Sequence, residues 1–223
     1  MTVPELPAFA ELAAAPDATM DLLALAMAAE FREVDVATAM ASLDTLGADV
    51  SAAAQRTAGS PEEVTAACTE VLGGVHGFEG DREHYDDPQN SMLDVVLRRR
   101  RGLPILLSVV YIEVARRAGI ALSGVGLPGH FVVGQFGAGA PILLDPFDGG
   151  REISAAAAIG ALRPWLPDEI AMRMLNNLVS SYSKRGDLTH AIRAAELRLL
   201  LPAPETLRDT LTSELRALHA RLN

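Results

Sequence analysis

The segment LPILLSVVYIEVARRAG, residues 103–119, constrains the fold more than any other part of the chain. Pro104 suits the first turn of a helix, where its missing N–H needs no partner, and Gly119 suits a helix end. Between them the segment is apolar almost all the way round, whereas a helix on a protein surface keeps a polar face. We therefore expect a buried helix in the middle of the domain.

The residues before this segment are rich in alanine and predict helices. Apolar residues recur at helical spacing over 18–31 and 34–54. A helix over 60–74 begins with a capping box formed by Ser60 and Glu63. A second capping box, Ser91 to Asp94, predicts the start of a helix that ends in the arginines 98–101. In this acidic chain we expect those arginines to pair with local acids such as Asp94 and the cluster at 81–87.

The residues after the apolar segment change pattern twice. Three short strands are predicted at 123–127, 130–136 and 141–145, the last two joined by the turn GAGA. From about residue 168 the helical spacing returns and indicates a helical hairpin around Arg185-Gly186-Asp187, followed by a third helix. This order predicts an α+β fold with a helical N-terminal lobe over 1–75, a core over 76–165 and a helical tail over 166–223.

Composition restricts the function. A 223-residue chain that is 49% hydrophobic can bury one substantial core. Its net charge of −10 argues against a nucleic-acid partner, because phosphate binding needs a basic face. The single cysteine, Cys68, excludes an internal disulfide framework and fits a reducing compartment. With neither a signal-peptide pattern nor an apolar run of about 20 residues, we expect a cytoplasmic protein without a membrane partner.

Two polar residues stand out in the predicted sheet. His130 begins one strand, and Asp145 ends the next. A histidine oriented by an aspartate is typical of hydrolases and acyl-transferases, which also need a nucleophile. The same pair can instead tie two strands together, and Asp-Pro is also common in turns. The sequence predicts the pairing but leaves both roles open.

Four motifs between residues 78 and 150 carry a family resemblance. They are a Tyr-x-Asp-Pro-x-Asn-Ser loop, an Arg-Gly-x-Pro-Ile helix start, Pro-Gly-His-Phe and Asp-Pro-Phe-x-Gly-Gly, in this order. Together they resemble the SirB-type branch of the transglutaminase-like (papain-fold) superfamily. The resemblance implies a core made of a buried central helix and a small antiparallel sheet. It also implies a helical N-terminal segment and a tetratricopeptide-like C-terminal tail.

The resemblance implies a central helix whose N-terminus carries a cysteine in catalytic members of this superfamily. It also implies a histidine and an aspartate on neighbouring strands. The helix terminus lowers the thiol pKa, and the histidine pairs with the thiolate. His130 and Asp145 match the second and third members. The position of the first falls at 103–105, where this chain has leucine, proline and isoleucine. Tyr85, Asn90 and Pro104 are expected to line the cleft.

Two side chains are candidate replacements for the missing nucleophile. Ser108 lies one helical turn after Pro104, where we expect it to donate to the Pro104 carbonyl inside the buried helix. Cys68 is expected in the core, as free cysteines commonly are. The loop 76–90 holds His76, His84 and several acids, but their spacing fits no standard metal site. We expect neither a metal nor a cofactor.

Two functions remain. The first is a transglutaminase-like protein without the catalytic cysteine that acts as a non-catalytic binding or regulatory module for a protein or peptide partner. The second is a hydrolase, peptidase or amide-transferase that uses Ser108 or Cys68 with His130 and Asp145. The absent cysteine favours the first.

Overall fold

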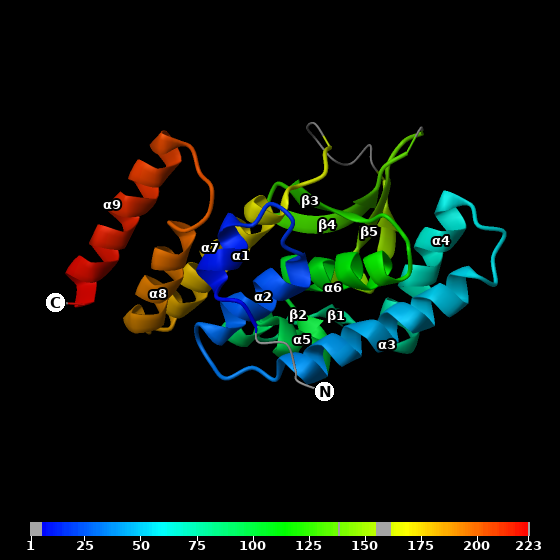
Figure 1. The fold of residues 1–223 in the computed structure, drawn as a ribbon, viewed down its shortest axis with the longest axis horizontal. Helices are drawn as coiled ribbons and strands as arrows, with labels where there is room; N and C mark the ends of the chain where they lie inside the picture. Colours follow the sequence, from blue (N-terminus) through cyan, green and yellow to red (C-terminus); the bar gives the residue numbers. More distant parts are fainter. Residues whose placement is uncertain (1–5, 138, 155–161, 223) are drawn as a thin grey trace.

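The computed structural model of the chain describes residues 6–137, 139–154 and 162–222, and it confirms the α+β class (Figure 1). A helical layer formed by the N-terminal half of the chain covers one side of the central helix, and a small sheet covers the other. The first helices are α1 (Phe9–Ala14), α2 (Met20–Ala29), α3 (Val36–Ala54) and α4 (Pro61–Cys68), which continues as a π-helical segment, η1 (Thr69–Val75).

The central helix is α6 (Pro104–Arg117), and it is buried as the sequence predicts. Its apolar side chains are almost completely inaccessible, because α2, α3 and α5 (Leu93–Arg99) pack on one side and the sheet on the other. Figure 1 shows α6 running between these two layers. No helix among the described residues is long and apolar enough to cross a membrane.

The sheet is antiparallel, with the strand order β3-β4-β5-β6. The three predicted strands appear as β3 (Ser123–Leu127), β4 (His130–Gln135) and β5 (Ile142–Asp145). The sequence did not indicate the fourth strand, β6 (Arg151–Ile153), or a two-residue parallel pair of β1 (Glu79–Gly80) and β2 (Arg101–Gly102). The turn GAGA includes residue 138, which lies outside the described residues.

A buried ion cluster joins the N-terminal helices to α6. Arg117 donates to Asp21 on α2 (Nη2–Oδ2 2.6 Å), to Asp44 on α3 (Nε–Oδ1 2.7 Å) and to Glu113 on its own helix (Nη1–Oε2 3.1 Å). Glu113 also accepts from the backbone N–H of Met20 at 3.0 Å. Asp21 and Glu113 are both buried. Sequence patterning did not reveal this cluster, because its members are far apart in the chain.

The arginine run at 98–101 meets acids, but not all of the predicted ones. Arg99 contacts Asp87 at 3.3 Å, and Arg101 contacts Glu79 at 2.5 Å. Asp94 was expected to pair with this run, and that prediction is wrong: Asp94 pairs with Arg32 instead. The expected capping box at Ser91 is also absent, because residues 88–91 form a 3-10 turn, η2 (Pro88–Ser91), and α5 begins after Met92.

The chain ends in three helices, α7 (Pro167–Lys184), α8 (Leu188–Arg198) and α9 (Glu205–Leu222). The predicted hairpin forms between α7 and α8, where Gly186 adopts a positive φ of 74° and Asp187 caps α8. Side chains of α7 and α8 belong to the same hydrophobic core as those of α2, α3 and α6. The helix α9 packs on α8 and lies at the outer edge of the fold (Figure 1). The domain boundaries at 75 and 165 stay predictions.

Candidate functional site

The sheet brings His130 and Asp145 together. In the β4–β5 register Val133 lies opposite Leu144, so Asp145 falls opposite Val132, two residues from His130. Side chains two residues apart in a strand share a face. The resulting contact joins His130 Nε2 and Asp145 Oδ2 at 2.9 Å, with 30% of the His130 side chain and 13% of the Asp145 side chain exposed.

A second interaction fixes the aspartate. Its other oxygen, Oδ1, accepts from the backbone N–H of Phe147 at 3.0 Å. Asp145 thereby also caps the short 3-10 helix η3 (Pro146–Asp148). Both carboxylate oxygens are occupied, one by the histidine and one by the turn. The two roles that the sequence left open, orienting a histidine and building a turn, are filled by the same side chain.

An aromatic row extends from the pair toward solvent. The Phe147 ring lies edge-on to His130, with centroids 6.2 Å apart, and Tyr85 lies edge-on to Phe147 at 6.0 Å. The guanidinium of Arg82 lies over the Phe147 ring at 4.8 Å. Phe147 belongs to the Asp-Pro-Phe motif, so the motif could have indicated that this ring lies beside the pair. Nothing in the sequence marked Arg82.

Arg173 on α7 reaches the site from the C-terminal part of the chain. Its Nη2 donates to the backbone carbonyl of His130 at 3.1 Å. Its guanidinium also lies over Phe131 at 5.7 Å and over Trp165 at 5.8 Å. Burial lowers the pKa of Arg173 from its usual value. Arg173 thus attaches α7 to the start of β4, a link that sequence spacing could not show.

The N-terminus of α6 offers no nucleophile. Leu103, Pro104 and Ile105 occupy it, and all three are buried. The backbone N–H of Leu103 donates to the Asn90 carbonyl at 3.1 Å, so the chain entering the helix is held by the preceding loop. The start of α6 is therefore closed and packed with apolar side chains, and its correspondence to the thiol position of catalytic members stays a prediction.

Both replacement candidates are buried and hydrogen-bonded within their own helices. The Ser108 hydroxyl is buried and donates to the Pro104 carbonyl at 2.8 Å, as the sequence predicts. Cys68 is buried in the core, and burial raises the pKa of its thiol to about 12. At neutral pH only about one such thiol in 10⁵ is ionised, so it is a very weak nucleophile. No hydrogen bond joins either side chain to His130 among the described residues.

The three residues expected on the cleft wall differ in their exposure to solvent. Tyr85 is 47% exposed and stands in the aromatic row. Asn90 and Pro104 are buried, and their place on a cleft wall stays a prediction. The Asn90 carboxamide donates to the His84 carbonyl at 2.8 Å and to Asp81 Oδ2 at 3.2 Å. Asn90 therefore shapes the loop from beneath.

The histidines of the loop 76–90 have separate partners. His76 contacts Asp49 at 2.9 Å, and His84 contacts Asp81 at 3.8 Å. Among the residues with described positions, no group of three His, Cys, Asp or Glu side chains could hold a metal ion.

Comparison with known proteins gives relatives in bacteria and mammals. A UPF0162 protein of Xylella fastidiosa is 40% identical over 153 aligned residues, which cover 60% of this chain and 54% of the relative. A UPF0162 protein of Pseudomonas aeruginosa is 34% identical over 140 residues, covering 54% of this chain and 49% of the relative. F-box only protein 21 of Homo sapiens is 30% identical over 129 residues, which cover 49% of this chain and 20% of the relative.

The chain spans about half the length of the bacterial relatives it matches. No solved structure gives a significant match. The family model described as transglutaminase-like superfamily matches residues 37–184, a range that includes the central helix, the sheet and the His130–Asp145 pair. The chain therefore belongs to the transglutaminase-like superfamily.

Proposed function

We propose that this chain is a non-catalytic member of the superfamily, from its SirB-type branch, that binds a protein or peptide partner. The observation that carries the proposal is a His130–Asp145 pair in a fold whose central helix begins without a nucleophile. A thiolate or alkoxide must lie within reach of the histidine for covalent catalysis. Ser108 is hydrogen-bonded within its own helix, and Cys68 is held as a neutral thiol in the core.

The pair also has a structural use that needs no nucleophile. Asp145 connects the start of β4 to the turn after β5 through its bonds to His130 and Phe147. A half-buried hydrogen bond to a charged group contributes about 1.5–3 kcal/mol to stability. The exposed side chains around the pair, Tyr85 and Arg82, are residue types that commonly anchor partners. A surface of this kind supports binding without chemistry.

The C-terminal helices support the same role. We propose that α7 and α8 form a tetratricopeptide-like unit, because Tyr182 stacks on His190 (centroids 5.0 Å apart) and small residues such as Ala191 allow the two helices to pack closely. One such unit is too short for a solenoid, and here it packs on the main core. The single, buried cysteine is consistent with a cytoplasmic location, which is part of this proposal.

Electrophilic probes test the absence of catalysis. The folded protein is treated with a fluorophosphonate and with iodoacetamide, and labelling is measured by intact mass. We expect neither Ser108 nor Cys68 to be labelled, whereas urea-unfolded protein should be labelled at Cys68. Labelling of either residue that disappears in His130→Ala would establish the hydrolase, peptidase or amide-transferase alternative and overturn the proposal.

Photo-crosslinking tests the binding surface. A benzophenone amino acid replaces Tyr85 in one variant and Leu222, at the end of α9, in a control; both positions are exposed. Irradiation of the protein in a cell extract should give discrete crosslinked products at position 85 and a weaker, diffuse pattern at position 222. Equal patterns at both positions would contradict a partner surface beside the His130–Asp145 pair.

A further inference from the structure

A groove lies along α7, on the face that carries Arg173. Its volume is about 630 Å³, and we call it the α7 groove. The lining residues come from the start of α7, the segment before it and the segment that leads into α9; those used below are Trp165, Leu166, Asp168, Arg173, Asn177 and Leu207. Because Arg173 also holds the carbonyl of His130, the groove adjoins the start of β4.

The apolar side chains of the groove are unusually exposed. Leu166 is 60% exposed and Leu207 is 39% exposed, and Trp165 stands beside them. Only six large hydrophobic residues are exposed in the described part of the chain, and two of them line this groove. An aromatic ring, leucines and an arginine gathered in one hollow are typical of the centre of a protein interface.

Two charged side chains of the groove, Arg173 and Asp168, have no ion-pair partner among the described residues. The carboxylate nearest to Arg173 along the helix is Glu169, one turn earlier, but Arg163 engages both of its oxygens at 2.7 and 2.5 Å. Arg173 forms no ion pair with any described carboxylate, and its only hydrogen bond to a described residue goes to the His130 carbonyl. A guanidinium carries five N–H donors, so donors are left for a carboxylate from outside.

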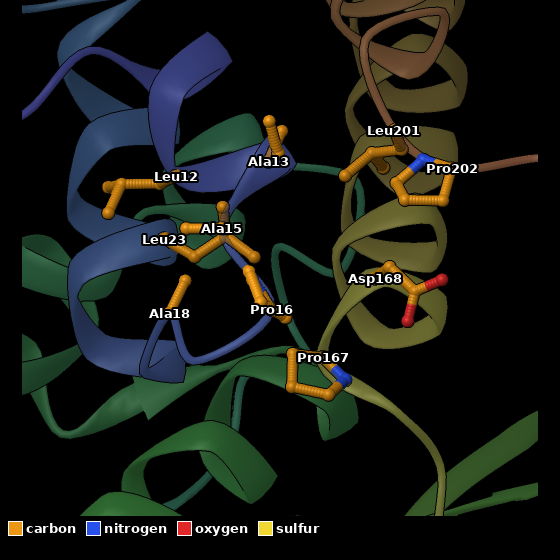
Figure 2. Close-up of a pocket in the computed structure, with 11 residues that line it drawn as sticks. Leu12, Ala13, Ala15, Pro16, Ala18, Leu23, Pro167, Asp168, Leu201 and Pro202 are labelled. Carbon is orange, nitrogen blue, oxygen red and sulfur yellow. The ribbon is translucent and has the colours of Figure 1, made fainter.

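Asp168 supplies the opposite charge, and it too has no ion-pair partner among the described side chains. It stands between the α7 groove and a small pocket of about 250 Å³ against α1. Figure 2 shows its carboxylate turned away from Leu12 and Leu23 of that pocket. The groove thus presents a cation and an anion on one helix. The carboxamide of Asn177, which has no hydrogen-bond partner among the residues that the structure describes, can donate to and accept from a peptide backbone.

The two unpaired charges select the occupant. Asp168 and Arg173 are five positions apart on α7, which places them about 7.5 Å apart along the helix axis and about 140° apart around it. We propose that the α7 groove binds an extended peptide segment that carries an acidic side chain for Arg173 and a basic side chain for Asp168. The inference rests on the binding role proposed above and names the class of partner.

A peptide array tests this inference. Heptapeptides of one Leu- and Pro-containing frame carry an acidic and a basic residue in either order and at several separations, only one of the two, or glutamine at both positions. Wild-type protein should bind the doubly charged set several-fold better than the glutamine set. Arg173→Gln should lose the preference for the acidic residue, and Asp168→Asn should lose the preference for the basic one. Arg56→Gln, an exposed change on the distant end of α3, should alter neither.

The outcomes separate the two proposals. If the wild type binds all sets equally, or if both groove variants keep the wild-type pattern, the α7 groove inference is refuted while a binding role elsewhere stands. If the wild type binds no peptide, both the inference and a peptide-binding role fall. Thermal melts of each variant show whether it is folded. Asp168→Asn provides the decisive comparison if Arg173→Gln is unstable, since Asp168 makes no described hydrogen bond that the substitution could break.

Discussion

The buried ion cluster around Arg117 permits a sharp prediction, because two carboxylates contact the same guanidinium from different environments. Asp21 is fully buried and accepts from Arg117 at 2.6 Å. Asp44 accepts from the same side chain at 2.7 Å, but it is 69% exposed. The two contacts have nearly equal length and differ in burial. Replacing each aspartate by alanine therefore measures how burial changes the value of an ion pair.

Removing Asp21 leaves the Arg117 guanidinium, whose side chain is only 11% exposed, without one of its two buried partners. Breaking a buried pair in this way costs about 3–5 kcal/mol. Glu113 stays within 3.1 Å of Arg117 and also loses a repulsive neighbour, so we expect the lower end, about 3 kcal/mol. For a domain of this size about 2–4 °C corresponds to 1 kcal/mol, which gives a fall in Tm of about 6–12 °C.

The control, Asp44→Ala, removes an exposed ion pair and should cost about 0–1 kcal/mol. Urea denaturation followed by circular dichroism gives both free energies of unfolding on one scale. Equal costs for the two variants, or a cost below about 1 kcal/mol for Asp21→Ala, would refute the reasoning that burial of Arg117 makes its inner partner the important one.

Three further predictions follow from other parts of the structure. Burial, with Asp21 nearby, raises the pKa of Glu113 above 4.5, so the stability that its protonated form contributes is lost as the pH rises through the folded-state pKa. Glu113→Gln should therefore lose less unfolding free energy than the wild type between pH 4.5 and 7.5. Equal losses for the two proteins would contradict the shift. Asp145→Ala should lower the free energy of unfolding by about 1–3 kcal/mol, because the backbone N–H of Phe147 and the ring of His130 lose their acceptor; an unchanged Tm would argue against a structural pair. Gly126→Ala should cost about 1–3 kcal/mol, since its new Cβ would lie 2.1 Å from the Trp165 ring, whereas Gly137→Ala, with open space around it, should cost far less; thermal melts compare the two.

The sequence predicted the elements whose signals are local. The central helix was indicated by Pro104, Gly119 and the apolar residues between them, and α4 by its capping box at Ser60. The three strands were indicated by short apolar runs between turn residues. The second capping box failed because residues 88–91 form a 3-10 turn and α5 begins after Met92, so Ser91 is not the cap. Asp94 pairs with Arg32, 62 positions earlier, a contact that no local pattern can reveal. β6 was missed because Arg151–Ile153 is too short to show alternation.

In the candidate site, too, residues with local sequence signals could be predicted, whereas residues placed by long-range contacts could not. His130 and Asp145 could be paired in advance, because the motifs placed them on neighbouring strands and strand geometry places them on one face. Arg173 could not, since it lies on α7, 43 residues after His130 in the chain. The burial of Asn90 was also hidden, because a polar residue in a polar loop is ordinarily exposed. Long-range packing, rather than local chemistry, determined both positions.

The contact of Trp165 with β3 has a consequence for association between molecules. β3 is at one end of the sheet order, so its outer side is a free edge of the kind that can recruit a strand from another chain. The backbone N–H of Trp165 donates to the Gly124 carbonyl at 2.9 Å, and its ring lies against Gly126. The segment before α7 thus occupies the edge with its own hydrogen bond and a bulky ring, and it protects the folded protein against edge-to-edge aggregation.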